Sequence, residues 1–188
     1  MEYGGENMSR VYFAGGYVYD LQEVFSRVKG VTDVVAGYVN GTCTDEQEVL
    51  AGDTDAALAI KVEFNPNKVD VGSLVQLFFK LINPFATPTH PKFRTGVYYE
   101  TADDVFQIEY YFRFLRMRGT EPVTTDSAIV MNDSVTRNLD TRPILTEMEK
   151  FLRFIPMPEE QQFYLRKNPD APKVLDIDAI VADGLIDD

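Results

Sequence analysis

The sequence contains one cysteine, one histidine and no tryptophan among 188 residues. The single cysteine, Cys43, excludes an intrachain disulfide, a cysteine-cluster metal site and an internal dithiol relay. The single histidine, His90, likewise excludes a histidine-rich metal centre. We therefore expect neither a metal nor another cofactor to be bound.

Basic residues are also scarce. There are 18 lysines and arginines against 30 acids, so the net charge is -12, which would repel a phosphate backbone and excludes nucleic acid as a partner. The acidity favours solubility, with a basic partner surface as the alternative. Long apolar runs are missing, and residues 1–7 have neither the basic start of a signal peptide nor an arginine-rich transit sequence. The sequence thus predicts a cytoplasmic protein without a membrane partner.

The apolar periodicity predicts an alternation of strands and helices in one domain with a substantial core. Strands are expected at 10–13, 31–39, 60–64 and 94–99, and helices at 20–28, 70–82 and 102–117. The order strand, helix, strand, strand, helix, strand is typical of a ferredoxin-like, split βαβ core. This is an α+β architecture, in which two helices cover one face of an antiparallel sheet.

Helix ends and additions to this core are also predicted. Asp20 and Asp70 are expected to cap the first two helices, with Glu23 as the capping-box partner of Asp20. The polar stretch of about 120–141 is long for a loop and predicts an insertion. We expect the main domain to span residues 1–169. The acidic segment 170–188 is predicted to form an amphipathic helix that docks on the domain or on a partner.

Several segments, in order and with consistent spacing, are similar to those of a known family. Val11–Asp20 reads as a strand, a Gly-Gly turn and a helix start, and resembles the segment in which the peptide methionine sulfoxide reductase A family has Gly-Cys-Phe-Trp-Gly. The resemblance runs from about Val11 to Pro169. Its further motifs are Val35–Tyr38, Glu48–Thr54, Val62–Pro66, Leu77–Pro84, Phe93–Tyr99 and Glu159–Pro169.

The resemblance implies a degenerate site. The family uses a cysteine thiolate to attack the sulfoxide sulfur, a glutamate with tyrosines and an aspartate to supply the proton, and a second cysteine to resolve the sulfenic acid. A resolving cysteine is missing near the end of this sequence. The positions that correspond to the nucleophile, one tyrosine, the glutamate, the aspartate and the other tyrosine are Tyr17, Glu46, Leu58, Pro88 and Phe93.

Four side chains near these positions allow two interpretations each. Tyr17 and Tyr19 would either form an aromatic binding pocket, or Tyr17 would fill the old pocket against Leu58, which we favour. Arg94 would bind an anion or pair with an acid. Cys43 would be a relocated nucleophile or, as we favour, an ordinary loop thiol, because Asp45 and Glu46 beside it would raise its pKa.

The sequence therefore predicts a catalytically inactive relative of the reductases. It would act as a binding module, or as a subunit of an assembly, with a protein or peptide partner. The alternative is a peptide-methionine (S)-S-oxide reductase that works through Cys43 and external thiols. The oligomeric state does not follow from the sequence.

Overall fold

The computed structural model describes residues 8–52, 54–118, 142–182, 184 and 186, the side chains of residues 117 and 118 aside. The expected insertion at about 120–141 lies outside this part of the chain. The helices are α1 (Val18–Phe25), α2 (Glu46–Leu50), α3 (Val71–Leu81), α4 (Ala102–Arg118), α5 (Tyr164–Lys167) and α6 (Ile177–Ala182), with 3-10 turns η1 (Pro91–Phe93) and η4 (Glu159–Gln161).

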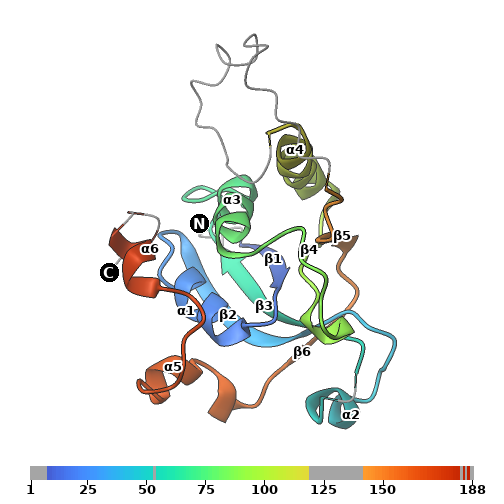
Figure 1. Cartoon of the computed structure of the whole chain (residues 1–188), viewed down its shortest axis with the longest axis vertical. Coiled ribbons are helices and arrows are strands. Elements are labelled where there is room, and N and C mark those ends of the chain that lie inside the picture. The colour runs from blue at the N-terminus through green and yellow to red at the C-terminus, as the bar shows by residue number, and fades with distance from the viewer. Residues whose placement is uncertain (1–7, 53, 119–141, 183, 185, 187–188) are drawn as a thin grey trace, which may run out of the picture.

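The described strands form one sheet. They are β1 (Ser9–Ala14), β2 (Val31–Val39), β3 (Ala57–Phe64), β4 (Gly96–Tyr99), β5 (Glu147–Lys150) and β6 (Phe154–Pro156), in the order β5-β4-β1-β3-β2-β6 (Figure 1). The four central strands are antiparallel and have the ferredoxin-like order. This confirms the predicted α+β class. β5 adds to one edge in parallel with β4, and β6 adds to the other edge against β2.

The helices bury one face of the sheet. Val11 and Phe13 of β1 point toward this face, and Phe13 stacks on Phe25 of α1 and contacts Phe78 of α3. α4 joins the same core through Phe112, whose ring meets Phe79 of α3 edge to face. Since successive strand residues point to opposite faces, the apolar alternation of β1 and β3 places the core on this side.

The other face of the sheet is covered by a short connection rather than by helices. Small residues and two tyrosines face this side, and Phe151, between β5 and β6, and Phe154, at the start of β6, pack on them. The ring of Phe151 stacks on Tyr12 at 4.2 Å, and that of Phe154 lies 5.6 Å away. A Cβ at Gly37 would lie 2.5 Å from the Phe154 ring, so glycine is required there for this close approach.

The predicted helix ends are right for α3 and wrong for α1. The carboxylate of Asp70 accepts a hydrogen bond from the Ser73 backbone N–H, as expected for an N-cap. α1 instead begins at Val18, with Tyr17 at the cap position and no side-chain cap bond. Asp20 lies inside the helix and is buried. Its carboxylate does not cap the helix, because it accepts hydrogen bonds from distant residues that are described below.

Candidate functional site

The turn between β1 and α1 joins the segments that the resemblance places at the site. The Gly15 N–H donates to the Leu58 carbonyl at 3.0 Å, which continues the β1–β3 ladder past Ala14. A Cβ added at Gly16 would lie 3.4 Å from Phe93. The turn thus places Leu58 and Phe93 next to the backbone that leads into Tyr17.

Tyr17 is tied to the end of a neighbouring helix. Its half-buried hydroxyl donates to the carbonyl of Leu81, the last residue of α3, at 2.7 Å. Carbonyls at a helix end have no partner within the helix, so the phenol satisfies one of them. Burial, with a smaller effect of Asp20, raises the pKa of Tyr17 above its ordinary value. The side chain is therefore a neutral hydrogen-bond donor near pH 7.

Tyr19 belongs to a different group of side chains. Its ring stacks on Tyr164 of α5 at 4.8 Å, and its hydroxyl donates to the Gln161 side chain at 3.2 Å. Burial raises its pKa, with further effects of the nearby Tyr38 and Tyr164. Tyr19 thus holds the C-terminal part of the chain against α1.

The other matched positions carry neither an acid nor a hydroxyl, except Glu46. Leu58 is half-buried and packs on the helix-side core. Phe93 is exposed, and the ammonium group of Lys92 lies 5.3 Å from its ring centre. Pro88 is exposed in the loop before η1, and Glu46 is exposed at the start of α2. None of these residues forms a proton-donating pair with Tyr17 among the interactions described.

Cys43 lies in the loop between β2 and α2. Its thiol contacts the Glu48 carboxylate at 3.2 Å and the Asp45 carbonyl at 3.7 Å. The hydrogen bond to Glu48 raises the pKa of Cys43 above its ordinary value. Since the thiolate is the nucleophilic form, this surrounding lowers the reactivity of the thiol.

Arg94 has protein partners for its guanidinium. Its Nε atom pairs with Glu147 of β5 at 2.9 Å, and one terminal nitrogen donates to the carbonyls of Asp55 and Pro91. Tyr98 donates to the same Glu147 oxygen. The arginine thus ties η1 to β5 and to the loop before β3, which is the structural interpretation of the two that the sequence left open.

Three polar residues of α1 that the sequence reasoning did not place at the site are buried and bonded to the C-terminal part of the chain. The Asp20 carboxylate accepts from the backbone N–H groups of Val174 and Leu175 at 2.8 and 3.0 Å. Glu23 pairs with Arg166 at 2.7 Å. The third residue, Gln22, is bonded to Gln162. No pattern of neighbouring residues predicts these pairs, because the partners lie far apart in the sequence.

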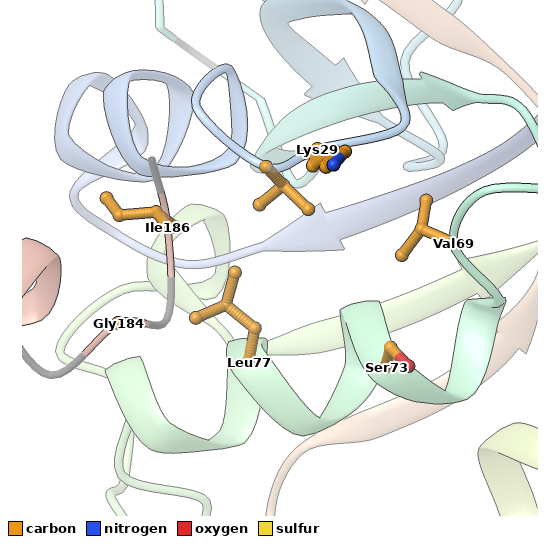
Figure 2. A pocket seen from close by; sticks show the side chains of 7 residues that line it. Lys29, Val69, Ser73, Leu77, Gly184 and Ile186 are labelled. Atoms are coloured by element: carbon orange, nitrogen blue, oxygen red, sulfur yellow. The ribbon is translucent and has the colours of Figure 1, made fainter. Parts of the chain in front are cut away.

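A cavity of about 290 Å³ lies beside the turn that follows the C-terminal end of α1 (Figure 2). It opens between the turn that follows α1 and the helix α3, and Lys29 and Ser73 are its polar residues. It is lined by Val28, Lys29, Val69, Ser73, Leu77, Gly184 and Ile186. Among the described residues, this lining contains no carboxylate and no thiol.

Two kinds of feature are absent from the described residues. In that part of the chain, no three histidine, cysteine, aspartate or glutamate side chains gather in a way that would hold a metal ion. Within the same residues, no helix has the length and apolar character needed to cross a bilayer.

Comparison with known proteins agrees with the fold and with the order of the motifs. The family described as "Peptide methionine sulfoxide reductase" matches residues 9–135. "Peptide methionine sulfoxide reductase MsrA" of Mycoplasma pneumoniae is 32% identical over 132 residues, which cover 66% of this chain and 84% of that protein. The chain belongs to the peptide methionine sulfoxide reductase family.

Solved structures show the same fold. Reduced Mxr1 from Saccharomyces cerevisiae has a TM-score of 0.67 at 19% identity, with 92% of each chain covered. Mxr1 in complex with Trx2 has a TM-score of 0.52 at 18% identity, with 87% of this chain and 89% of that chain covered.

Proposed function

We propose that this chain is a family member without sulfoxide reductase activity that serves as a binding module or as a subunit of a protein assembly. The observation that carries the proposal is Tyr17, whose hydroxyl is bonded to the Leu81 carbonyl where the family resemblance requires a reactive thiol. A half-buried phenol with a raised pKa is no substitute for a thiolate.

The chemistry of sulfoxide reduction explains why this position is decisive. A thiolate attacks the sulfoxide sulfur, the oxygen is transferred to the cysteine, and methionine leaves as the thioether while the enzyme retains a sulfenic acid. An acid must protonate the oxygen during this step. Tyr17 and Leu58 stand at the two corresponding positions and supply neither the thiolate nor the acid.

The alternative is a reductase that works through Cys43 and an external thiol. The presence of this thiol and the names of the relatives favour it. The raised pKa of Cys43 beside Glu48 opposes it, because less thiolate is present at pH 7. No positioned acid is bonded to Cys43 except Glu48, and a second cysteine does not exist in the sequence.

Turnover of an S-epimer methionine sulfoxide peptide with excess dithiothreitol distinguishes the two. We expect no methionine above the level without protein, for the wild type and for Cys43→Ser. Activity that disappears in Cys43→Ser would overturn the proposal in favour of the alternative. Activity that survives in Cys43→Ser would overturn both, because no thiol would remain.

A variant with the family's chemistry restored provides a positive control. Tyr17→Cys combined with Leu58→Glu returns a thiol and a carboxyl group to the two positions. We expect this variant to release methionine with dithiothreitol as the reductant, and Tyr17→Ser with Leu58→Glu to remain inactive. Failure of the restored variant to react, in a folded state, would argue against the assignment of Tyr17 to the nucleophile position.

The partner that we propose is a protein or a peptide. Mxr1, which shares the fold, has been solved in complex with Trx2. For this chain, the surface around Tyr17, the 120–141 stretch and the acidic segment 170–188 are the proposed contact regions. Cross-linking of the full chain to proteins of its own cell, with Tyr17→Asp as the comparison, tests the first of these regions.

A further inference from the structure

The outer face of α4 exposes aromatic side chains. Phe106 is 76% exposed and Tyr110 is 59% exposed. The Tyr110 ring continues into a cluster with Tyr111 at 6.0 Å and Phe114 at 6.4 Å. The opposite face of the helix is already buried in the core through Ile108, Phe112 and Leu115. Core packing therefore does not explain the outer aromatic residues, and contiguous exposed apolar surface marks an interaction site.

Two charged residues flank Phe106 and Tyr110 along the helix, and the spacing of the four residues is symmetric. Asp103, Phe106, Tyr110 and Arg113 follow one another at intervals of three, four and three residues. Such intervals place all four on one line along a helix. In an antiparallel copy of the helix, the four residues have the same spacing, but the acid and the base have changed places. It is therefore complementary to an antiparallel copy of itself.

We propose that α4 pairs with α4 of a second copy of this chain, antiparallel and around a two-fold axis. Phe106 of each copy packs on Tyr110 of the other, and Asp103 of each copy pairs with Arg113 of the other. Such an interface is isologous, with the same patch used on both sides. Among the described elements, α4 lies at one end of the structure, away from β2 and β6 (Figure 1).

Two features of the chain bear on the strength of this pairing. Within one copy, Arg113 pairs with Glu109 at 3.6 Å, and charged side chains near the helix ends interact with the helix dipole. These interactions explain the charged residues of α4, but they do not explain its exposed rings. The net charge of -12 opposes association. At physiological salt, charges farther apart than about 8 Å are largely screened, so the local contacts decide.

The size of the face sets the expected affinity. A helix of 17 residues is about 25 Å long and about 10 Å wide. Pairing along one face buries on the order of 1,000 Å² in total, which is the lower limit of a specific interface. We therefore expect a micromolar dimer rather than an obligate one. The inference does not depend on whether the chain reduces sulfoxides.

Sedimentation velocity of the full chain over a range of concentrations tests the aromatic contact. We expect reversible dimerisation of the wild type, and at least tenfold weaker association of Phe106→Ser combined with Tyr110→Ser. The matched control is Leu152→Ser, because Leu152 is 75% exposed on a different segment. A wild type that stays monomeric, or equal weakening by Leu152→Ser, would overturn the proposal.

Charge reversal tests the orientation. Asp103→Lys and Arg113→Glu each place like charges together twice in a homodimer, so we expect both variants to be monomeric. An equimolar mixture restores two opposite-charge pairs and should form a one-to-one heterodimer with roughly wild-type affinity. Asp178→Lys controls for the change in net charge. A mixture that stays monomeric, or a single variant that dimerises like the wild type, would contradict antiparallel pairing.

Discussion

The side-chain amide of Gln22 donates to the side-chain carbonyl of Gln162 at 2.8 Å, across 140 residues of sequence. Both side chains are buried, and in both the amide nitrogen and the amide oxygen form hydrogen bonds. Gln22 also donates to Val34 and accepts from the Phe163 N–H, while Gln162 bonds both backbone groups of Ala36. This pair fastens the C-terminal part of the chain to α1 and β2.

Gln162→Ala should destabilise the protein by about 2 to 4 kcal/mol, because it leaves several buried polar groups without partners. Urea unfolding measures this loss. Gln161→Ala is the matched control, since its side chain makes only the longer bond to Tyr19, and we expect a cost of about 1 kcal/mol or less. Equal costs for the two variants would contradict the importance of the buried pair.

Tyr17→Phe should cost about 1 kcal/mol of unfolding free energy, because the carbonyl of Leu81 loses its donor while the ring remains in place. Tyr17→Ala should cost about 3 kcal/mol or more, since the ring volume is also lost. Urea unfolding of both variants separates the two contributions. A neutral Tyr17→Phe would show that water replaces the hydroxyl without loss.

Glu48→Gln should make Cys43 react faster with iodoacetamide. The Glu48 carboxylate accepts the hydrogen bond of the thiol, favours the protonated form and so raises the pKa of Cys43. Removing that charge lowers the pKa, and at pH 8 more thiolate is present, by roughly two- to threefold. Glu46→Gln is the control without a contact to the sulfur. The pH profile of alkylation should shift to lower pH only for Glu48→Gln.

Glu147→Ala should destabilise the protein by about 2 kcal/mol, because Arg94 and the buried Tyr98 hydroxyl lose their shared acceptor. Glu149→Ala, on the same strand but exposed, should change stability by less than about 0.5 kcal/mol. The comparison is made by thermal and urea unfolding. A large effect of both would indicate that the strand β5 itself, rather than the bond to Arg94, had been disturbed.

The local pattern of the sequence was sufficient for the central sheet and for α3. The strand at Val31–Val39 is confirmed, and so is the cap at Asp70. The partners of these residues are close in sequence, or are specified by the alternation of apolar side chains. Such signals depend on neighbours only, so they are visible in a single sequence.

Other features were beyond the reach of the sequence because they depend on distant residues. Asp20 is of a residue type that is common at helix caps, but its partners are the backbone N–H groups of Val174 and Leu175. The acceptor for Arg94 was foreseen only as one of many acids, and the structure identifies it as Glu147. The proposal of a degenerate site rests on the resemblance to the family, whereas the bond from Tyr17 to Leu81 could not be predicted from it.

The bonds from α1 to the C-terminal segment have a consequence for synthesis on the ribosome. Asp20 is synthesised 155 residues before Leu175, and its carboxylate accepts a hydrogen bond from the Leu175 N–H group. At 5–20 residues per second, the interval between the two is about 8 to 30 s. During that time Asp20 lacks the backbone donors that it accepts from, and Gln22 and Glu23 lack their bonds to Gln162 and Arg166. The domain therefore completes its fold only after residue 175 has been made, and a ribosome that stalls before residue 162 carries an incomplete core.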